Sequence, residues 1–234
     1  MKRHAIAALA ASLLILPSLA LAESRTIEVG SFHGVDVSSG IRAIVAAGKP
    51  QSVVAEANNQ RDLDDLRYEL RGGVLHLWYD WNIAGIFDWT GRDITVTIGA
   101  EQLDALQAAA GASLEATGLM GEDIALEASS GAFLKADGIE GMTYDIESSS
   151  GARIETSGLC TSAQIEASSG ASISAKGLDC AKVAVEISSG ASVEVTAKES
   201  IDAEVSSGGH ASVFGKPSFE SLETSSGGSV EFKN

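Results

Sequence analysis

A Ser-Ser-Gly triplet that recurs at nearly constant intervals constrains the fold of this chain more than any other feature. The last residues of the triplets form one series, which Gly111 joins in the same frame after Ala109 and Ala110: Gly111, Gly131, Gly151, Gly170, Gly190, Gly208 and Gly227. The intervals are 20, 20, 19, 20, 18 and 19 residues. A fixed period of this length is typical of solenoids, in which each repeat is one coil that covers the previous one.

The segments between the triplets have the pattern of strands. Apolar residues stand three and five places after each glycine, as Leu114 and Ala116 do, with polar residues between them. Alternation with a period of two indicates a strand with one buried face. A second strand is expected before each triplet. Between the two strands, a second set of glycines, each able to adopt positive φ, predicts a second corner: Gly118, Gly138, Gly158, Gly177 and Gly215.

We therefore predict an all-β fold, a right-handed parallel β-helix (β-solenoid) with coils of about 19–20 residues and an irregular N-terminal cap region. Equivalent strands of successive coils would stack in parallel, about 4.8 Å apart. Parallel crossovers are overwhelmingly right-handed, which favours a right-handed coil. An antiparallel sandwich is the alternative, but it explains only the alternation and not the constant register of the glycines.

The beginning of the chain predicts export. Lys2 and Arg3 precede an apolar run from Ala5 to Leu16, and a small-residue site ends at Ala22. This arrangement is that of a secretory signal peptide, residues 1–22, and the run is too short for a transmembrane anchor. We expect a periplasmic or secreted protein with no membrane span in the mature chain.

Residues 23–110 are expected to form irregular coils, a short helix and a cap. One copy of the marker occurs here as Ser38-Ser39-Gly40. A helix is predicted over residues 61–66 after the capping candidates Asn58 and Asn59. A hairpin over 68–79 would turn at Gly72-Gly73, and residues 94–98 alternate as another strand. Residues 111–234 are the predicted regular solenoid, whose open end this region would cover.

Several of these features together resemble a known bacterial family. They are the signal peptide, the segment from Asp36 to Ile41, the stretch from Asp62 to Leu66 with its Gly-Gly hairpin, and the repeated Ser-Ser-Gly-Ala turns. The chain resembles the auto-transporter adhesin head GIN domain family over nearly its whole mature length. The resemblance implies a parallel β-helix in the cell envelope or outside the cell, with an adhesive role and no catalytic residues to carry over.

Charge and composition exclude some partners and chemistries. Removal of Lys2 and Arg3 with the signal takes the formal net charge from −16 to −18, so nucleic acid is not an expected partner. Few histidines survive removal of the signal, and none lies in a triad or zinc-site pattern. We therefore predict a non-catalytic protein that binds an envelope or surface protein or carbohydrate. A structural envelope protein and a polysaccharide-active β-helix enzyme are the alternatives.

A column of acidic residues is the most regular chemical pattern. A glutamate stands four residues before each marker glycine from Gly131 onward: Glu127, Glu147, Glu166, Glu186, Glu204 and Glu223, with Asp36 at the same place earlier. Stacked coils would turn these carboxylates into a ladder on one outward face. They either extend into solvent or bind divalent cations, and Ca²⁺, which favours several carboxylate oxygens, is the one candidate cofactor.

The aromatic residues cluster in a single stretch. All three tryptophans lie between residues 78 and 89, where the candidate ligand-binding residues are Trp78, Tyr79, Trp81, Phe87 and Trp89. Clustered aromatics can stack on sugars or anchor a protein partner. The alternative is that they close the end of the solenoid.

The two cysteines, Cys160 and Cys180, are separated by one coil. Neighbouring coils would bring them within the Cα separation of roughly 4.4 to 6.8 Å that a disulfide accepts. Export to an oxidising compartment favours the bond. The alternative is a pair of buried thiols.

Overall fold

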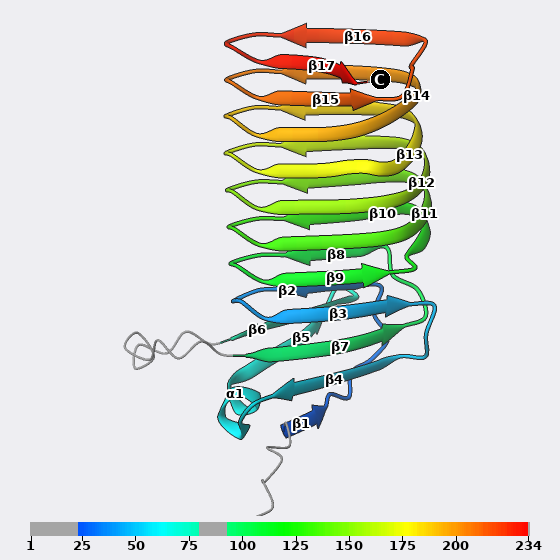
Figure 1. Ribbon diagram of the computed structural model, residues 1–234. Helices are drawn as coiled ribbons and strands as arrows, with labels where there is room; N and C mark the ends of the chain where they lie inside the picture. The colour runs from blue at the N-terminus through cyan, green and yellow to red at the C-terminus, as the bar shows by residue number, and fades with distance from the viewer. Residues whose placement is uncertain (1–22, 80–92, 234) are drawn as a thin grey trace, which may run out of the picture.

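The computed structural model describes residues 23–79 and 93–233 and shows a tall β-solenoid with a smaller region of mixed pairing at its N-terminal end (Figure 1). The regular coils, about six of them at a spacing of about 20 residues, contain strands β8 to β17. Their bounds are β8 Ala105–Ala108, β9 Ser113–Thr117, β10 Met120–Ala128, β11 Phe133–Ser148, β12 Arg153–Ala167, β13 Ser172–Ile187, β14 Ser192–Val205, β15 His210–Phe214, β16 Phe219–Thr224 and β17 Ser229–Lys233.

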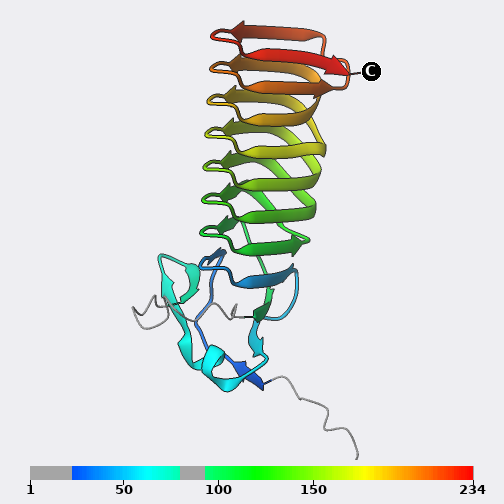
Figure 2. The same ribbon diagram turned by 60° about the vertical axis from the view of Figure 1, so that its left-hand side comes forward.

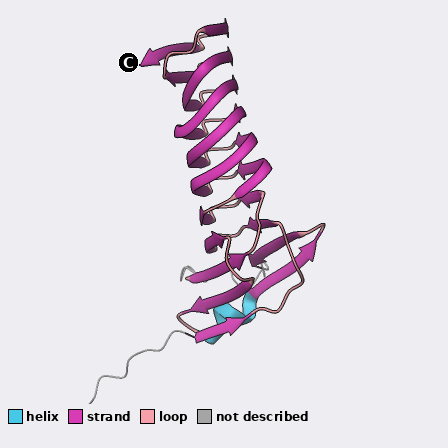
Figure 3. Ribbon diagram, turned by 90° about the vertical axis from the view of Figure 1, so that its right-hand side faces the viewer, coloured by secondary structure: helices cyan, strands magenta, loops and turns pink. Residues whose placement is uncertain are grey.

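Each coil consists of two strand segments joined by a smooth bend at one edge and a tight turn at the other. The long strands β11 to β14 run through the bend, so each contributes to both faces of the flattened coil (Figures 1 and 3). Successive strands pair in parallel, as β11 does with β10 and β12. The coils rise right-handed along the chain, as predicted, and the antiparallel sandwich is wrong for this part of the structure.

The tight turns place two successive residues in the left-handed region. In one turn, φ is 52° at Ser130 and 70° at Gly131, and the Ala132 amide donates to the Ser129 carbonyl at 3.1 Å. These φ values fit a type I′ turn. The amide of Gly131 donates to the carbonyl of Ser150 in the next coil at 3.1 Å, so the turns are also bonded to each other. The sequence pattern predicts positive φ for glycines alone, so the left-handed serines before the marker glycines are not expected from it.

The bends vary more from coil to coil than the turns do. Positive φ occurs at Gly118, Gly138, Gly158 and Gly215, as predicted, but not at Gly177. At Gly177 a larger residue has no room instead, because its Cβ would lie 2.9 Å from Cβ of Ser157. The register also shifts at the bends, between β11 and β12 and again between β12 and β13. The interval of 18 to 20 residues therefore varies where the chain bends.

The core is built from columns of apolar side chains that point between the two faces. One column lies on the face that ends at the tight turns and runs Leu106, Leu126, Ile146, Ile165, Val185, Ala203 and Leu222. All of its members except Leu222 are at most 1% exposed. Each side chain is thus covered by its equivalents in the coils on either side, which is how a thin coil acquires a buried core.

The solenoid begins N-terminal to Gly111 in the chain. Strands β2 (Gly34–Val37) and β3 (Arg42–Ala47) flank the early Ser38-Ser39-Gly40 turn and pair in parallel with β8 and β9. Strands β6 (Val74–Tyr79) and β7 (Ile94–Ala100) pair in parallel with β2 and β3 from the other side. The residues around Gly40 therefore form a coil continuous with the regular ones.

The remaining N-terminal elements cover this end (Figure 2). They are β1 (Glu23–Thr26), β4 (Ser52–Ala57), β5 (Leu66–Arg71) and helix α1 (Gln60–Asp65). Strand β4 pairs antiparallel with β7 and β1, and β5 forms the predicted hairpin with β6 across Gly72-Gly73. The helix begins one residue before its predicted start, with the side chain of Asn59 accepting from the Asp62 amide at 3.0 Å. Leu63, 1% exposed, closes the core from this helix.

The predicted disulfide between Cys160 and Cys180 is present. The two residues are direct partners in the parallel pairing of β12 and β13, with a Cα–Cα distance of 4.6 Å. The bond lies near the bend, where the register between these two strands shifts. It links two coils near the bend, where the backbone pairing of β12 with β13 is less regular than in the rest of these strands.

Replacing both cysteines tests what this link contributes. The variant with Cys160→Ala and Cys180→Ala should lose about 3 kcal/mol of unfolding free energy, because closing a loop of 20 residues restricts the unfolded chain by that amount. Chemical denaturation of the oxidised wild type, the reduced wild type and the variant measures the difference. Equal stability of all three would contradict it, and so would two free thiols in the mass spectrum of the unreduced protein.

Candidate functional site

The predicted acidic ladder exists and is unbroken. The six glutamates are direct register partners from coil to coil along β10 to β14 and β16. Glu166 is half-buried and the other five are exposed. Because parallel pairing fixes the register of each strand on the last, the carboxylates form one straight column perpendicular to the strands. We call this column the glutamate ladder: Glu127, Glu147, Glu166, Glu186, Glu204 and Glu223.

A shallow groove runs along the glutamate ladder. It has a volume of about 380 Å³ and lies between the glutamates and the serines that begin the tight turns. Those serines supply its second wall: Ser149, Ser168, Ser188, Ser206 and Ser225. The groove thus offers carboxylates on one side and a row of turn residues with hydroxyl groups on the other. We call it the acidic groove.

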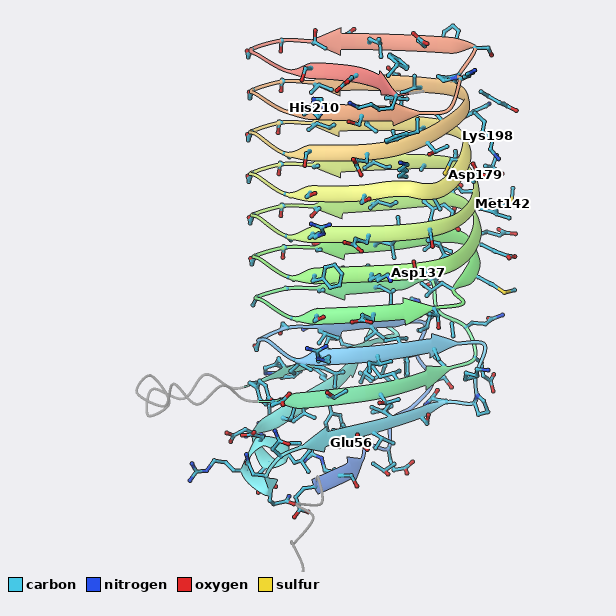
Figure 4. The ribbon with its side chains drawn as sticks, viewed as in Figure 1. Glu56, Asp137, Met142, Asp179, Lys198 and His210 are labelled. Atoms are coloured by element: carbon cyan, nitrogen blue, oxygen red, sulfur yellow. A yellow bond between two sulfur atoms is a disulfide. The ribbon has the colours of Figure 1, made fainter. Side chains whose placement is uncertain are left out.

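Neighbouring carboxylates of the glutamate ladder repel each other. At a spacing of about 4.8 Å, neighbouring carboxylates repel by about 0.9 kcal/mol in bulk water and about 3.5 kcal/mol at an effective dielectric of 20. Burial raises the pKa of Glu147, and nearby carboxylates raise it further: Asp145, Glu166 and Glu127. In the described residues the lysine and arginine ion pairs lie elsewhere, such as Lys198 with Asp179 at the bend (Figure 4).

Two residues that the sequence analysis missed extend the column toward the N-terminus. Gln107 is the register partner of Glu127, and its Nε2 donates to Oε2 of that glutamate at 2.8 Å. Gln107 pairs in turn with Asp36, whose Oδ2 lies 2.8 Å from Nδ1 of His76. Gln107 also stands four residues before Gly111, so the marker frame could have identified it. Nothing in the repeat pointed to His76.

The metal expectation remains a prediction. Among residues 23–79 and 93–233, no group of three or more His, Cys, Asp or Glu side chains converges on one point. The glutamate ladder is linear, so a cation on it would be held by carboxylates of successive coils.

The candidate aromatic residues fall into two groups. Trp78 is half-buried on β6, and Tyr79 is only 4% exposed and packs in the core cluster. Trp81, Phe87 and Trp89 lie outside the described residues. The described end of this stretch therefore contributes to packing at the N-terminal region, while the ligand-binding hypothesis for the other three residues stays a prediction.

Comparison with known proteins identifies the family. The model described as "Putative auto-transporter adhesin, head GIN domain" matches residues 31–217. The chain therefore belongs to this family, as its sequence features predicted. An exported family of this kind fits a location in the cell envelope or outside the cell.

Solved structures support the fold at low sequence identity. A putative adhesin from Bacteroides fragilis has a TM-score of 0.77 and 15% identity, with 93% of this chain and 99% of that chain covered. A putative adhesin from Parabacteroides distasonis has a TM-score of 0.69 and 15% identity, with 92% and 98% covered. A putative lipid binding protein from the same species has a TM-score of 0.67 and 16% identity, with 91% and 97% covered. No curated protein matches the chain.

In the part of the chain that the structure describes, no helix is long and apolar enough to cross a membrane.

Glu147→Gln should stabilise the protein at neutral pH. The folded-state pKa of Glu147 is raised, so its ionised form opposes folding above that pKa and the cost disappears as pH falls below the unfolded value. Thermal melts should show a gain of roughly 1–3 °C at pH 7 that vanishes near pH 3. Glu115→Gln, on the other face beside Lys135, is the control and should give no gain. A lower melting temperature for Glu147→Gln at pH 7 would contradict the repulsion.

Proposed function

We propose that this chain is an exported, non-catalytic, adhesin-like protein of the periplasm or cell surface, and that it binds an extended, positively charged partner in the acidic groove. The observation that carries the proposal is the in-register row of six glutamates along that groove. The family and its structural neighbours are named as adhesins or binding proteins, which supports a binding role.

The shape of the groove favours a polymer. Six coils place the first and last glutamates of the ladder about 24 Å apart, at about 4.8 Å per coil. A chain with positive groups along its length would contact several carboxylates at once. Contacts of this kind reinforce each other, because after the first contact the remaining ones form within one complex.

The energetics favour a cationic partner. Without one, the carboxylates repel each other, and this repulsion adds to the effect of burial in raising the pKa of Glu147. A row of positive charges would replace this repulsion with attraction along the whole ladder. A surface that costs stability in the free protein and is favourable only when occupied is a common property of binding sites. A basic segment of an envelope protein or an amino-bearing polysaccharide provides such charges.

Poly-lysine is a defined probe for this surface. The combined variant Glu147→Gln, Glu166→Gln, Glu186→Gln should bind fluorescent poly-lysine about tenfold more weakly than wild type, because it removes three charge pairs of about 0.5 kcal/mol each. The matched control is Glu115→Gln, Glu155→Gln, Glu194→Gln, which makes the same change in net charge on the other face of the solenoid. Fluorescence anisotropy at physiological salt measures both.

The control should lose less than about twofold in affinity, since its glutamates lie away from the groove. Equal losses in the two variants would show that poly-lysine responds only to net charge, and would contradict the proposed site. The calcium hypothesis is tested in the same titration: Ca²⁺ should displace poly-lysine at concentrations where NaCl of equal ionic strength does not. Equal displacement by both salts would remove Ca²⁺ as a specific ligand.

A further inference from the structure

The C-terminal end of the solenoid is formed by two strands with uncovered edges. Among the described residues, β16 pairs only with β14 and β17 only with β15. Figures 1 and 2 show these strands as the last layer of the stack, with nothing described beyond them. An uncovered edge presents unpaired amide and carbonyl groups and is a template for another strand.

The apolar core is exposed at the same end. Leu222 is 42% exposed and Phe232 is 40% exposed, whereas their register partners one coil earlier, Ala203 and Val213, are fully buried. Val230 continues another core column and is only partly buried. These side chains occupy positions that every earlier coil covers with the next one. The other two inward positions of β16 are polar, because Glu220 and Thr224 follow Ile201 and Val205 of the previous coil. The terminal coil therefore presents an uncovered apolar centre on both faces, with polar side chains on either side of Leu222.

The other end cannot accept this surface, because α1, β1, β4 and β5 cover it. Head-to-tail stacking of copies is thus blocked. A contact between two C-terminal ends remains open, and such a contact closes after two copies.

We propose that two copies of this chain associate through their terminal coils, related by a twofold axis that passes through both faces, so that β16 and β17 each pair antiparallel with their own copy. The resulting dimer is one continuous β-solenoid of twice the length, with an N-terminal region at each outer end. Leu222, Val230 and Phe232 of both copies form the apolar part of its central layer, and Glu220 and Thr224 lie beside Leu222.

The two glutamates of β16 do not oppose each other in this arrangement. A register that places Leu222 opposite the partner's Leu222 keeps the core column continuous, since directly opposed residues point to the same face. Glu220 then faces the partner's Thr224 on the inward side, where the threonine hydroxyl can donate to the carboxylate, and Ser221 faces the partner's Glu223 on the outward side. No two glutamates are opposed in this register, although β16 carries two of them.

The charges on β17 are self-complementary. With Phe232 opposite the partner's Phe232, Glu231 faces the partner's Lys233 in both directions. Within one chain the same two side chains already form an ion pair, so they lie on one outward face and are available to a neighbour. Opposite charges on directly opposed strand positions stabilise antiparallel pairing, whereas like charges oppose it.

Sedimentation of the mature protein measures the association directly. We expect wild type to sediment at twice the monomer mass at micromolar concentration. Phe232→Asp should raise the dissociation constant about a hundredfold or more, because the twofold axis brings two new carboxylates, one from each copy, together at the apolar centre of the interface. The side chain is 40% exposed in the single chain, so the fold of the monomer should survive the change.

Met142→Asp is the matched control, because Met142 is 58% exposed and lies at the bend, several coils from the terminal strands (Figure 4). It should leave the dimer intact. In oxidised Leu222→Cys, a disulfide between the two copies is expected from the proposed register. A wild type that stays monomeric, a mass that keeps growing with concentration, or equal effects of Phe232→Asp and Met142→Asp would overturn the proposal.

Discussion

The parallel backbone pairing of each coil with the next is the interaction on which the rest of this structure depends. It fixes the register between coils, and the register decides which side chains meet. Apolar residues at equivalent places become core columns, such as the one from Leu106 to Val185. Cys160 and Cys180 become neighbours for the same reason. The turns take part as well, because amides such as that of Gly131 bond to the carbonyl of the next turn.

The same register concentrates charge. A glutamate at one place in the repeat would be an ordinary solvated side chain, but six in register form a ladder. Burial raises the pKa of Glu147 in this ladder, and the neighbouring carboxylates raise it further. The core columns and the turns stabilise the solenoid despite this repulsion. Repetition therefore converts one sequence position into an extended surface of uniform chemistry, and that surface defines the proposed binding site. The two ends, which break the repetition, differ: one is covered by α1 and β4, and the other ends at β16 and β17.

The sequence predicted most of this, because the marker glycines define the frame. Strand positions, the glutamate ladder and the Cys160–Cys180 bond all follow from counting within that frame. The bends were harder to predict, because the chain there gains or loses a residue and local sterics decide its path, as at Gly177. The left-handed serines, such as Ser130, were missed because positive φ was assigned to glycine alone. His76 was missed because it reaches the column through long-range pairing of β6 with β2.

The distance between the two ends of the glutamate ladder tests the central claim most directly. Spin labels at Glu127→Cys and Glu223→Cys, in protein diluted with unlabelled copies, report it by double electron–electron resonance with the native disulfide intact. Five coil spacings of about 4.8 Å predict a narrow distribution centred at about 24 Å, broadened by the label linkers. A broad distribution, or a centre displaced by more than two coil spacings, would show that the coils do not stack in the register on which the core, the ladder and the groove all depend.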